Sequence, residues 1–270
     1  MNDLLPRIVG ALIYIIALLG GLYFRQPYWL FVCTLLFVFA MYEWSSMKTN
    51  MNKNKTFLLT GLCLFIFLQF TLFLASKAHG PAWNNLAILL GTTYYLFCSL
   101  VFRKEIFAQK FAPGLFIYIL IPFTFLYMLG LAIPPNYLLM LFCIIWINDT
   151  FAYLGGKMFG RTKLAPRISP GKTWEGTIIG IGVAGLMSYI AARYLIEMEE
   201  YAIWFSIGII VAIFGNVGDL FESKIKRRHG IKDSGKLLPG HGGILDRMDS
   251  LLFAIPLYYI FVTILNVPIK

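Results

Sequence analysis

The stretch Tyr137–Gly156, YLLMLFCIIWINDTFAYLGG, is apolar along almost its whole length. The hydrocarbon core of a bilayer is about 30 Å thick, so a spanning helix needs roughly 20 apolar residues. Backbone N–H and C=O groups in lipid must hydrogen-bond to one another, so only helices and closed barrels can span a bilayer. The stretch lacks the alternation of apolar and polar residues that is typical of a barrel strand. It therefore predicts a transmembrane α-helix with three polar residues, Asn148-Asp149-Thr150, in its second half.

Runs of the same kind occur along the whole chain. Of its 270 residues, 59% are hydrophobic and 13% are charged, whereas a soluble domain has about 25% charged residues. Eight further runs are long enough to span a bilayer: Ile8–Phe24, Tyr28–Met47, Thr56–Ala75, Trp83–Phe102, Phe111–Leu131, Gly176–Leu195, Ala202–Phe221 and Met248–Val267. We therefore predict an all-α, polytopic integral membrane protein with about nine transmembrane helices.

The polar motifs divide the chain into two regions. Residues 1–135 hold five predicted spans and form an N-terminal transmembrane region. Residues 136–270 hold the other spans and two polar loops, 157–175 and 222–247. Ionisable groups inside a membrane are costly and usually functional, so we expect the C-terminal region to carry the chemistry.

The positive charges predict the orientation. Nine spans put 19 of the 23 Lys and Arg residues on one side of the bilayer and four on the other, Arg25, Lys77, Arg193 and Lys270. Because Lys and Arg concentrate in cytoplasmic loops, the N-terminus and both polar loops are predicted to be cytoplasmic. The net charge of +10 fits this topology and attraction to anionic lipid headgroups, and we expect no nucleic-acid partner.

The first candidate site residues are Asn148 and Asp149, inside the sixth predicted span. A carboxylate at a helix centre costs about 2.5–3.5 kcal/mol on insertion scales. Asp149 is therefore expected to face a site within the bundle. The alternative is that these residues form an interhelical hydrogen bond that only holds the helices together.

The second candidate is the polar segment Ser169-Pro170-Gly171-Lys172-Thr173-Trp174-Glu175-Gly176, which opens the seventh predicted span. Pro170 and Gly171 predict a turn. The backbone N–H groups of a helix start, with Lys172 beside them, would make a phosphate site. An ordinary helix start with an interfacial Trp is the alternative, and the segment lacks the leading glycine and preceding strand of a Walker A motif.

The third candidate is the long polar segment from Asn216 to Asp249. Asp219 and Glu222 are three residues apart and share a helical face, and Asp246 and Asp249 have the same spacing. Magnesium usually takes one or two carboxylates plus substrate phosphates, so these acids predict a metal site. Neighbouring basic residues would neutralise phosphate charge, although each of them alone could be a solvated loop residue. Glycines at 240, 242 and 243 would let a ligand approach the backbone closely.

The segment Ser223–Asp249 resembles the signature of the phosphatidate cytidylyltransferase (CDP-diacylglycerol synthase) family. Seventeen positions over 27 residues fit that pattern: Ser223, Ile225, Lys226, Arg227, Lys232, Asp233, Gly235, Leu238, Pro239, His241, Gly242, Gly243, Ile244, Asp246, Arg247, Met248 and Asp249. The segment 169–176 is similar to a second stretch shared by the family. The resemblance implies that a phosphatidate oxygen attacks the α-phosphorus of CTP, which releases pyrophosphate and CDP-diacylglycerol. It also implies Mg²⁺, a homodimer, and a site at the cytoplasmic face of the cell inner membrane.

The resemblance and the residue types together suggest roles. One or two divalent cations are expected on Asp219, Asp246 and Asp249, and a second cation of another type stays open. The candidate catalytic residues are Asp219, Lys226, Arg227, His241, Asp246, Arg247 and Asp249. The candidate substrate-binding residues are Asn148, Asp149, Ser169, Lys172, Thr173, Glu175, Ser223, Lys232, Asp233, Gly242 and Gly243.

Two alternatives remain at this stage. A CTP-dependent membrane kinase of the polyprenol or dolichol type would share the nucleotide but phosphorylate an alcohol, and the intact signature argues against it. A transporter of an anionic solute would use Asp149 and Asp219 as coupling carboxylates. That alternative predicts an inverted repeat, and the sequence shows none.

Overall fold

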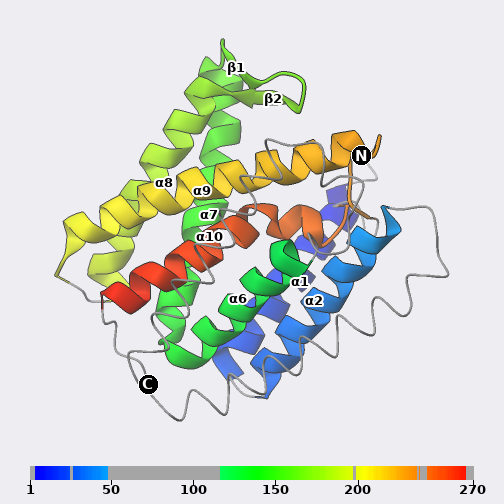
Figure 1. Cartoon of the computed structure of the whole chain (residues 1–270). Helices are drawn as coiled ribbons and strands as arrows, with labels where there is room; N and C mark the ends of the chain where they lie inside the picture. Colours follow the sequence, from blue (N-terminus) through cyan, green and yellow to red (C-terminus); the bar gives the residue numbers. More distant parts are fainter. Residues whose placement is uncertain are drawn as a thin grey trace.

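The computed structural model describes residues 4–24, 27–47, 116–196, 199–235, 237 and 242–265. They form mainly helices, as predicted, together with one small sheet (Figure 1). In chain order, the elements are α1 (Leu4–Phe24), α2 (Tyr28–Ser46), the π-helical turn η3 (Phe116–Leu120), α6 (Ile121–Ala132), α7 (Pro135–Phe159), β1 (Lys163–Ala165), β2 (Ser169–Thr173), α8 (Trp174–Tyr194), α9 (Tyr201–Arg228) and α10 (Leu245–Ile264).

The helices are those of a membrane-embedded protein. Among the described residues, four helices are long and apolar enough to cross a bilayer, α7, α8, α9 and α10. Shorter apolar stretches occur at Tyr14–Phe24, Tyr28–Trp44 and Tyr118–Ala132. The predicted spans Thr56–Ala75 and Trp83–Phe102 lie outside the described residues, as does the start of the fifth span.

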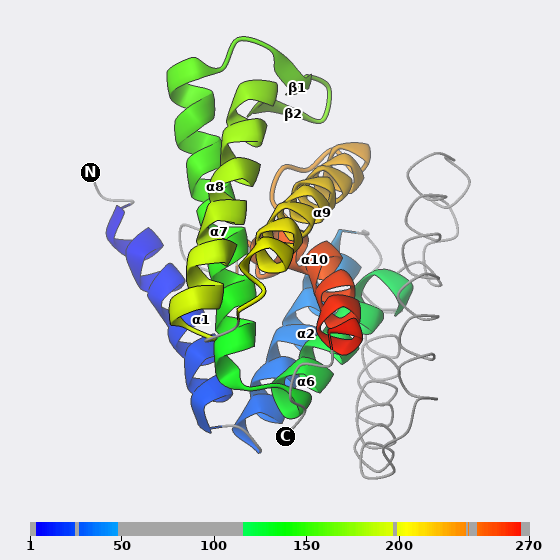
Figure 2. The ribbon, with the colours of Figure 1, turned by 90° about the vertical axis from the view of Figure 1, so that its left-hand side faces the viewer.

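Helices α7 and α8 pack closely along a seam of small residues. Figure 2 shows them side by side, with β1 and β2 at their shared end. A Cβ atom added to Gly180 would lie 2.6 Å from the carbonyl oxygen of Asn148 and 2.9 Å from Cβ of Ala152. A Cβ added to Gly176 would meet the backbone of Ala152 and Gly156. Small residues of this kind let helix backbones approach in lipid, where the hydrophobic effect does not drive association.

The seam gives a testable prediction for stability. Gly180→Ala is expected to cost about 1–2 kcal/mol, because overpacking outweighs the gain in helix propensity. The measurement is the thermal unfolding midpoint in detergent–lipid micelles. Gly182→Ala is the matched control on the same helix, because a Cβ there meets no atom within 4 Å. An equal or higher midpoint for Gly180→Ala would contradict the close contact.

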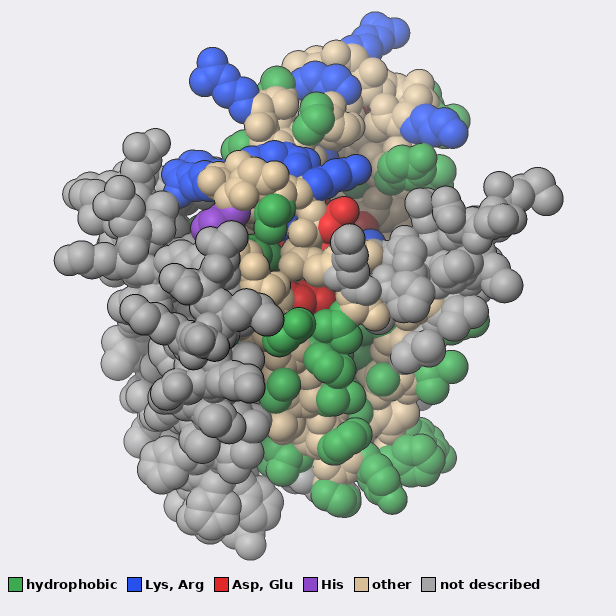
Figure 3. Space-filling model, turned by 90° about the vertical axis from the view of Figure 1, so that its right-hand side faces the viewer, with side chains coloured by type: hydrophobic (Ala, Val, Ile, Leu, Met, Phe, Trp, Pro, Cys, Tyr) green, Lys and Arg blue, Asp and Glu red, His purple; other side chains and the backbone are tan. Residues whose placement is uncertain are grey.

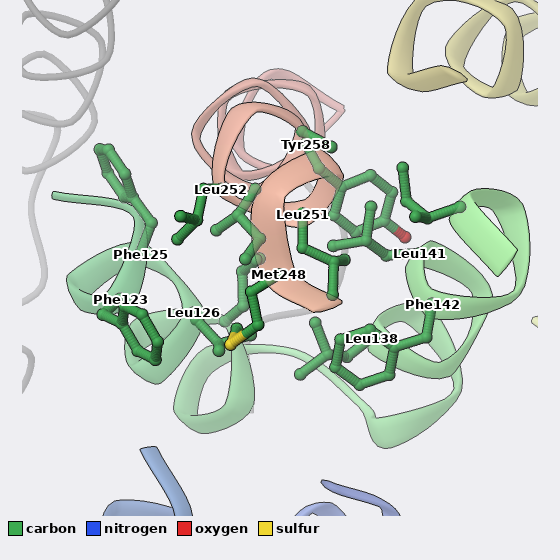
Figure 4. Close-up of a cluster of buried hydrophobic side chains, with 14 of the residues drawn as sticks. Phe123, Phe125, Leu126, Leu138, Leu141, Phe142, Met248, Leu251, Leu252 and Tyr258 are labelled. Atoms are coloured by element: carbon green, nitrogen blue, oxygen red, sulfur yellow. The ribbon is translucent and has the colours of Figure 1, made fainter. Parts of the chain in front are cut away.

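Helix α10 lies within the buried core and packs against α9, α6, α7 and α2. Figure 4 shows its side chains facing those of α6 and α7, among them Met248, Leu251 and Leu252 against Phe123, Leu126, Leu138 and Leu141. A polar contact joins the same helices, since the Tyr258 hydroxyl donates to the Tyr137 carbonyl oxygen at 2.7 Å. This packing fixes the direction of α10, whose first turn carries the candidate acids.

The polar ends of several helices lie together. Backbone N–H groups at the start of α10 reach Glu43 near the end of α2. The Arg227 side chain at the end of α9 reaches Ile168 in the connection between α7 and α8. At the opposite end, the Asn136 side chain at the start of α7 donates to the Leu195 carbonyl oxygen just after α8. The two predicted polar loops are therefore neighbours in space.

The structure corrects the predicted loop 157–175. Helix α7 continues to Phe159 and α8 begins at Trp174, and between them β1 and β2 form an antiparallel hairpin. Pro170 and Gly171 lie in β2, so the predicted turn there is wrong. The turn is at Ala165–Ile168, where Ile168 N donates to the Ala165 carbonyl oxygen at 3.1 Å. Proline at the second turn position, Pro166, favours that turn because its φ is already fixed.

The predicted loop 222–247 is also too long at both ends. Helix α9 continues to Arg228 and α10 begins at Leu245. The polar residues after Phe221 stay helical because they pair within the protein, as Lys226 does with Glu222 and Asp246. The connection is therefore shorter than predicted, and both ends are anchored on helices.

Candidate active site

Helix α9 presents four candidate residues on one side. Asp219, Ser223, Lys226 and Arg227 are spaced as one helical face requires, and the Ser223 hydroxyl donates to Asp219 Oδ1 at 3.1 Å. Figure 3 shows the surface at this end of the molecule, where Lys and Arg side chains lie above a few carboxylates and apolar side chains cover the surface below. Positively and negatively charged side chains therefore lie next to the apolar surface at this end of the molecule.

A buried ion-pair cluster joins α9 to α10. Lys226 Nζ lies 2.6 Å from Asp246 Oδ1 and 3.1 Å from Glu222 Oε1. Glu222 is fully buried and Lys226 is 7% exposed. Burying charges costs several kcal/mol per ion unless each has a counter-charge, so Lys226 is essential to both carboxylates.

Asp246 also holds the polar connection. Its Oδ2 accepts from Ser234 N at 2.9 Å and from Gly243 N at 2.8 Å. Gly242 has φ +81°, and a Cβ there would lie 2.7 Å from Asp246 Oδ2. Glycine adopts this left-handed conformation at no steric cost, so Gly242 allows the backbone to fold around the Asp246 carboxylate.

A second group of acids comes from three helices. Asp149 of α7, Asp219 of α9 and Asp249 of α10 lie close enough to repel one another electrostatically. Asp149 is oriented by amides, since Asn216 Nδ2 donates to Asn148 Oδ1 at 3.0 Å and Asn148 Nδ2 donates to Asp149 Oδ1 at 3.0 Å. Asn148 thus makes the interhelical hydrogen bond that was the alternative for this pair, and residue Asp149 is exposed on the surface of the helix bundle.

The hairpin brings Lys172 to this group. Lys172 Nζ lies 2.6 Å from Asp219 Oδ2, and both side chains are partly accessible. Arg227 provides a further link, because Nε donates to the Ile168 carbonyl oxygen at 3.3 Å and Nη1 donates to the Ile231 carbonyl oxygen at 3.1 Å. A single guanidinium therefore holds the hairpin and the polar connection on α9.

Two predicted substrate-binding residues contact backbone at the base of the hairpin. Thr173 Oγ1 caps α8 by accepting from Gly176 N at 3.3 Å. The Glu175 carboxylate accepts from the N–H groups of Arg161 and Thr162, each at 3.1 Å. Both residues support the segment that carries Lys172.

Comparisons with known proteins identify a family. The family model described as "Cytidylyltransferase family" matches residues 5–265. The chain belongs to the cytidylyltransferase family.

Relatives carry a more specific name. A phosphatidate cytidylyltransferase of Staphylococcus haemolyticus is 34% identical over 265 residues, which cover 94% of this chain and 95% of the relative. A Staphylococcus aureus protein of the same name is 49% identical over 124 residues, so this chain spans about half of that relative, 47% of its length. One from Rickettsia typhi is 46% identical over 151 residues, 53% of this chain and 66% of the relative. The family resemblance of the signature is confirmed.

The acids of the candidate site fit a divalent cation in part. Asp219 and Asp249 supply neighbouring oxygens of the kind Mg²⁺ prefers. Asp246 already accepts from Lys226 and from two backbone N–H groups. Consistent with that arrangement, the described residues contain no group of three His, Cys, Asp or Glu side chains placed to hold a metal ion. Of the predicted set of three, Asp246 thus anchors the connection and Asp219 pairs with Lys172.

The remaining candidates lie around this centre. Lys232, Asp233 and Arg247 are exposed, Ser169 lies in β2, and Gly243 precedes α10. His241 lies outside the described residues. The candidate site thus draws on α7, the hairpin, α9 and the first turn of α10.

Two buried acids, Glu222 and Glu43, were not identified from the sequence as candidate site residues. Glu222 was noticed only for sharing a face with Asp219, yet it is fully buried beside Lys226. Glu43 lies in α2, is 1% exposed, and contacts the polar connection from the N-terminal region. An acid inside a predicted span is costly and so marks a functional or structural role. That argument, applied to Asp149, would also have singled out Glu43.

The double contact of Arg227 predicts a measurable effect on the hairpin. Lysine cannot bridge two carbonyl oxygens as a guanidinium does. We expect Arg227→Lys to lower turnover about tenfold, the value of one lost charged hydrogen bond, and to speed amide hydrogen exchange in residues 163–173. Arg228→Lys, the next residue on α9, is the control. Unchanged exchange in the hairpin would contradict the tether.

Proposed function

We propose that the protein is a phosphatidate cytidylyltransferase of phospholipid biosynthesis, which converts CTP and phosphatidate to CDP-diacylglycerol and pyrophosphate. One observation carries the proposal. Lys172 of the hairpin pairs with Asp219 of α9 at 2.6 Å, and Lys226 of the same helix pairs with Asp246 of α10 at 2.6 Å, in a region that also carries Asp149 and Asp249. Nucleotidyl transfer requires carboxylates that can hold a metal ion and cationic side chains that can neutralise phosphates, since catalysis of this reaction is mainly positioning and charge neutralisation.

The proposed reaction needs no strong general base. A phosphatidate oxygen, already anionic, forms a bond to the α-phosphorus of CTP as the bond to the bridging oxygen breaks, and pyrophosphate leaves with that electron pair. Lys172, Lys232 and Arg247 would bind phosphate oxygens. Lys226, which is buried, would stabilise the negative charge of the phosphates electrostatically. Arg227 would keep the hairpin over the substrates. Preorganised charges of this kind stabilise the transition state without reorganisation.

We further propose that Mg²⁺ serves this site. Asp219 and Asp249 would hold it, with the substrate phosphates supplying further oxygens. When bound, the cation would neutralise phosphate charge. Lys172 Nζ, at 2.6 Å from Asp219, would then turn from the carboxylate toward a substrate phosphate.

The proposal includes a place in the membrane. A nine-span topology with a cytoplasmic N-terminus, in the cell inner membrane, would put the hairpin and the connection 229–244 in the cytoplasm, within reach of CTP. Residues 136–270 would be the catalytic region and residues 1–135 the supporting transmembrane region. Phosphatidate would keep its acyl chains in lipid, where the apolar surface below the carboxylates supports that approach (Figure 3). A homodimer is the assembly proposed from the family.

The test uses purified protein in detergent–lipid micelles with phosphatidate, Mg²⁺ and CTP labelled at the α- or γ-phosphate. The proposal expects α-label in the lipid fraction, with pyrophosphate released, and loss of transfer when EDTA removes the cation. Transfer of γ-label to a polyprenol would instead identify a kinase. If folded protein transfers neither label, the proposed reaction is wrong, and solute transport is the next function to test.

A further inference from the structure

Glu43 of α2 makes three hydrogen bonds to a segment about 200 residues away. It accepts from Ser234 Oγ at 3.0 Å, from Ile244 N at 2.9 Å and from Leu245 N at 2.9 Å. Only 1% of the residue is exposed. A buried carboxylate that accepts three hydrogen bonds makes a strong contact, since each charge-assisted hydrogen bond is roughly twice as strong as a neutral one.

The contact supplies what the sequence at the start of α10 lacks. The first N–H groups of a helix have no intrahelical partner, and a Ser, Thr, Asp or Asn at the N-cap usually accepts from them. Here the N-cap is Ile244, whose side chain cannot accept. Glu43 takes the N–H groups of Ile244 and Leu245, and Asp246 takes that of Gly243. Two carboxylates, one from another helix, thus replace the missing cap at the positive end of the helix dipole.

Ser234 connects these two carboxylates. Its hydroxyl donates to Glu43 Oε2 at 3.0 Å, and its backbone N–H donates to Asp246 Oδ2 at 2.9 Å. Asp246 Oδ1 in turn lies 2.6 Å from Lys226 Nζ. A continuous chain of contacts therefore runs from α2, through the connection, to Asp246 and Lys226 on the candidate catalytic helices.

The backbone at Gly235 and at Gly243 lies against the Glu43 side chain. A Cβ added to Gly235 would lie 2.7 Å from Glu43 Oε1, and one added to Gly243 would meet Glu43 Oε2 and Ser234 Oγ. Any side chain at these two positions would push the carboxylate away from its donors. The two glycines of the signature segment are thus explained by close approach to an acid outside that segment.

We propose that Glu43 is a positioning residue for nucleotidyl transfer, which acts through Ser234 on Asp246 and Lys226. The inference rests on the proposed function, because it assigns Glu43 to the same site. It places one determinant of turnover in the N-terminal region, outside the signature. Misplacing catalytic groups by about 1 Å can cost roughly 10²-fold in rate, so the expected effect is large although Glu43 touches no substrate.

The test compares wild type, Glu43→Gln, Ser234→Ala and the double variant in detergent–lipid micelles. Glutamine keeps the shape but offers one acceptor oxygen, so it must leave a donor unpaired. We expect Glu43→Gln to lower kcat per folded molecule about 10²-fold and to change KM for CTP far less. Amide exchange at residues 243–245 should rise. If the effect passes through Ser234, the double variant should be no slower than Glu43→Gln alone.

The outcomes separate this proposal from its alternatives. Glu200→Gln, the same change on an exposed residue at the start of α9, is the control. Faster exchange with unchanged kcat would make Glu43 a structural cap only and overturn the positioning role. If Glu43→Gln does not fold, Ser234→Ala decides, and an unchanged kcat there overturns the proposal. If wild type itself transfers nothing, the proposed function fails, whereas the exchange data still report whether the cap exists.

Discussion

Lys226→Met is expected to lower the stability of the protein by about 3–5 kcal/mol, the usual cost of removing one partner from a buried ion pair. Glu222 is fully buried and Asp246 is largely enclosed, and Lys226 contacts both. The substitution would leave two carboxylates without their counter-charge. We also expect phosphatidate-dependent transfer to fall by roughly 10²–10³-fold, the range for removing one preorganised charge. The measurements are the thermal unfolding midpoint and kcat per folded molecule.

A double variant separates folding from chemistry. Lys226→Met with Glu222→Gln removes one orphaned charge and should recover part of the lost midpoint. Transfer should stay low, because Asp246 would still lack its ion-pair partner. The substrate phosphates would also still lack the positive charge of Lys226. Recovery of transfer together with the midpoint would mean that Lys226 serves stability alone. A midpoint unchanged in the single variant would contradict the buried cluster itself.

Asp249→Asn should have the opposite effect on stability. Burial disfavours the charged Asp249 carboxylate most, Asp219, Glu222 and Asp149 add repulsion, and Lys226 offsets part of this. Neutralising it is expected to leave the midpoint unchanged or to raise it, because the substitution removes a buried charge that lies among other carboxylates. Transfer is expected to fall at least about 10³-fold, because a metal ligand contributes several kcal/mol to the transition state. A gain in stability with loss of activity is typical of a functional acid.

The measurements for Asp249→Asn are the unfolding midpoint, label transfer, and the Mg²⁺ concentration that restores half of the activity. Glu200→Gln again controls for the loss of one negative charge. Full activity in Asp249→Asn would exclude Asp249 as a metal ligand. A large drop in midpoint would instead show that this carboxylate is a structural anchor, as Asp246 is for the connection.

Long apolar runs made much of the described fold predictable. The predicted spans Tyr137–Gly156 and Gly176–Leu195 agree with α7 and α8 to within three residues, because a run of 20 apolar residues has few other stable states. The ends were less predictable. Polar residues after Phe221 suggested a loop, yet they extend α9 because their partners come from another helix. Pairing of this kind leaves no periodic signal in one chain segment.

The hairpin and the cap were not predictable from local pattern. Lys163–Thr173 contains two prolines and a glycine, which favour turns, and the Arg227 side chain that contacts the hairpin at Ile168 comes from the distant helix α9. Most candidate residues of the site were found because the signature gathers them within one segment. Glu43 was not found, because a lone acid in an apolar run gives no indication of a partner about 200 residues away.

The contact between Glu43 and α10 has a consequence for how the protein is made. Glu43 and Leu245 are 202 residues apart, and ribosomes add about 5–20 residues per second. Glu43 therefore enters the bilayer roughly 10–40 s before its donors exist, by that rate. During this interval α2 carries a buried acid that lacks the partners it has in the finished fold. The contact can form only after α10 has been synthesised, so the junction between α2 and α10 is completed late in synthesis.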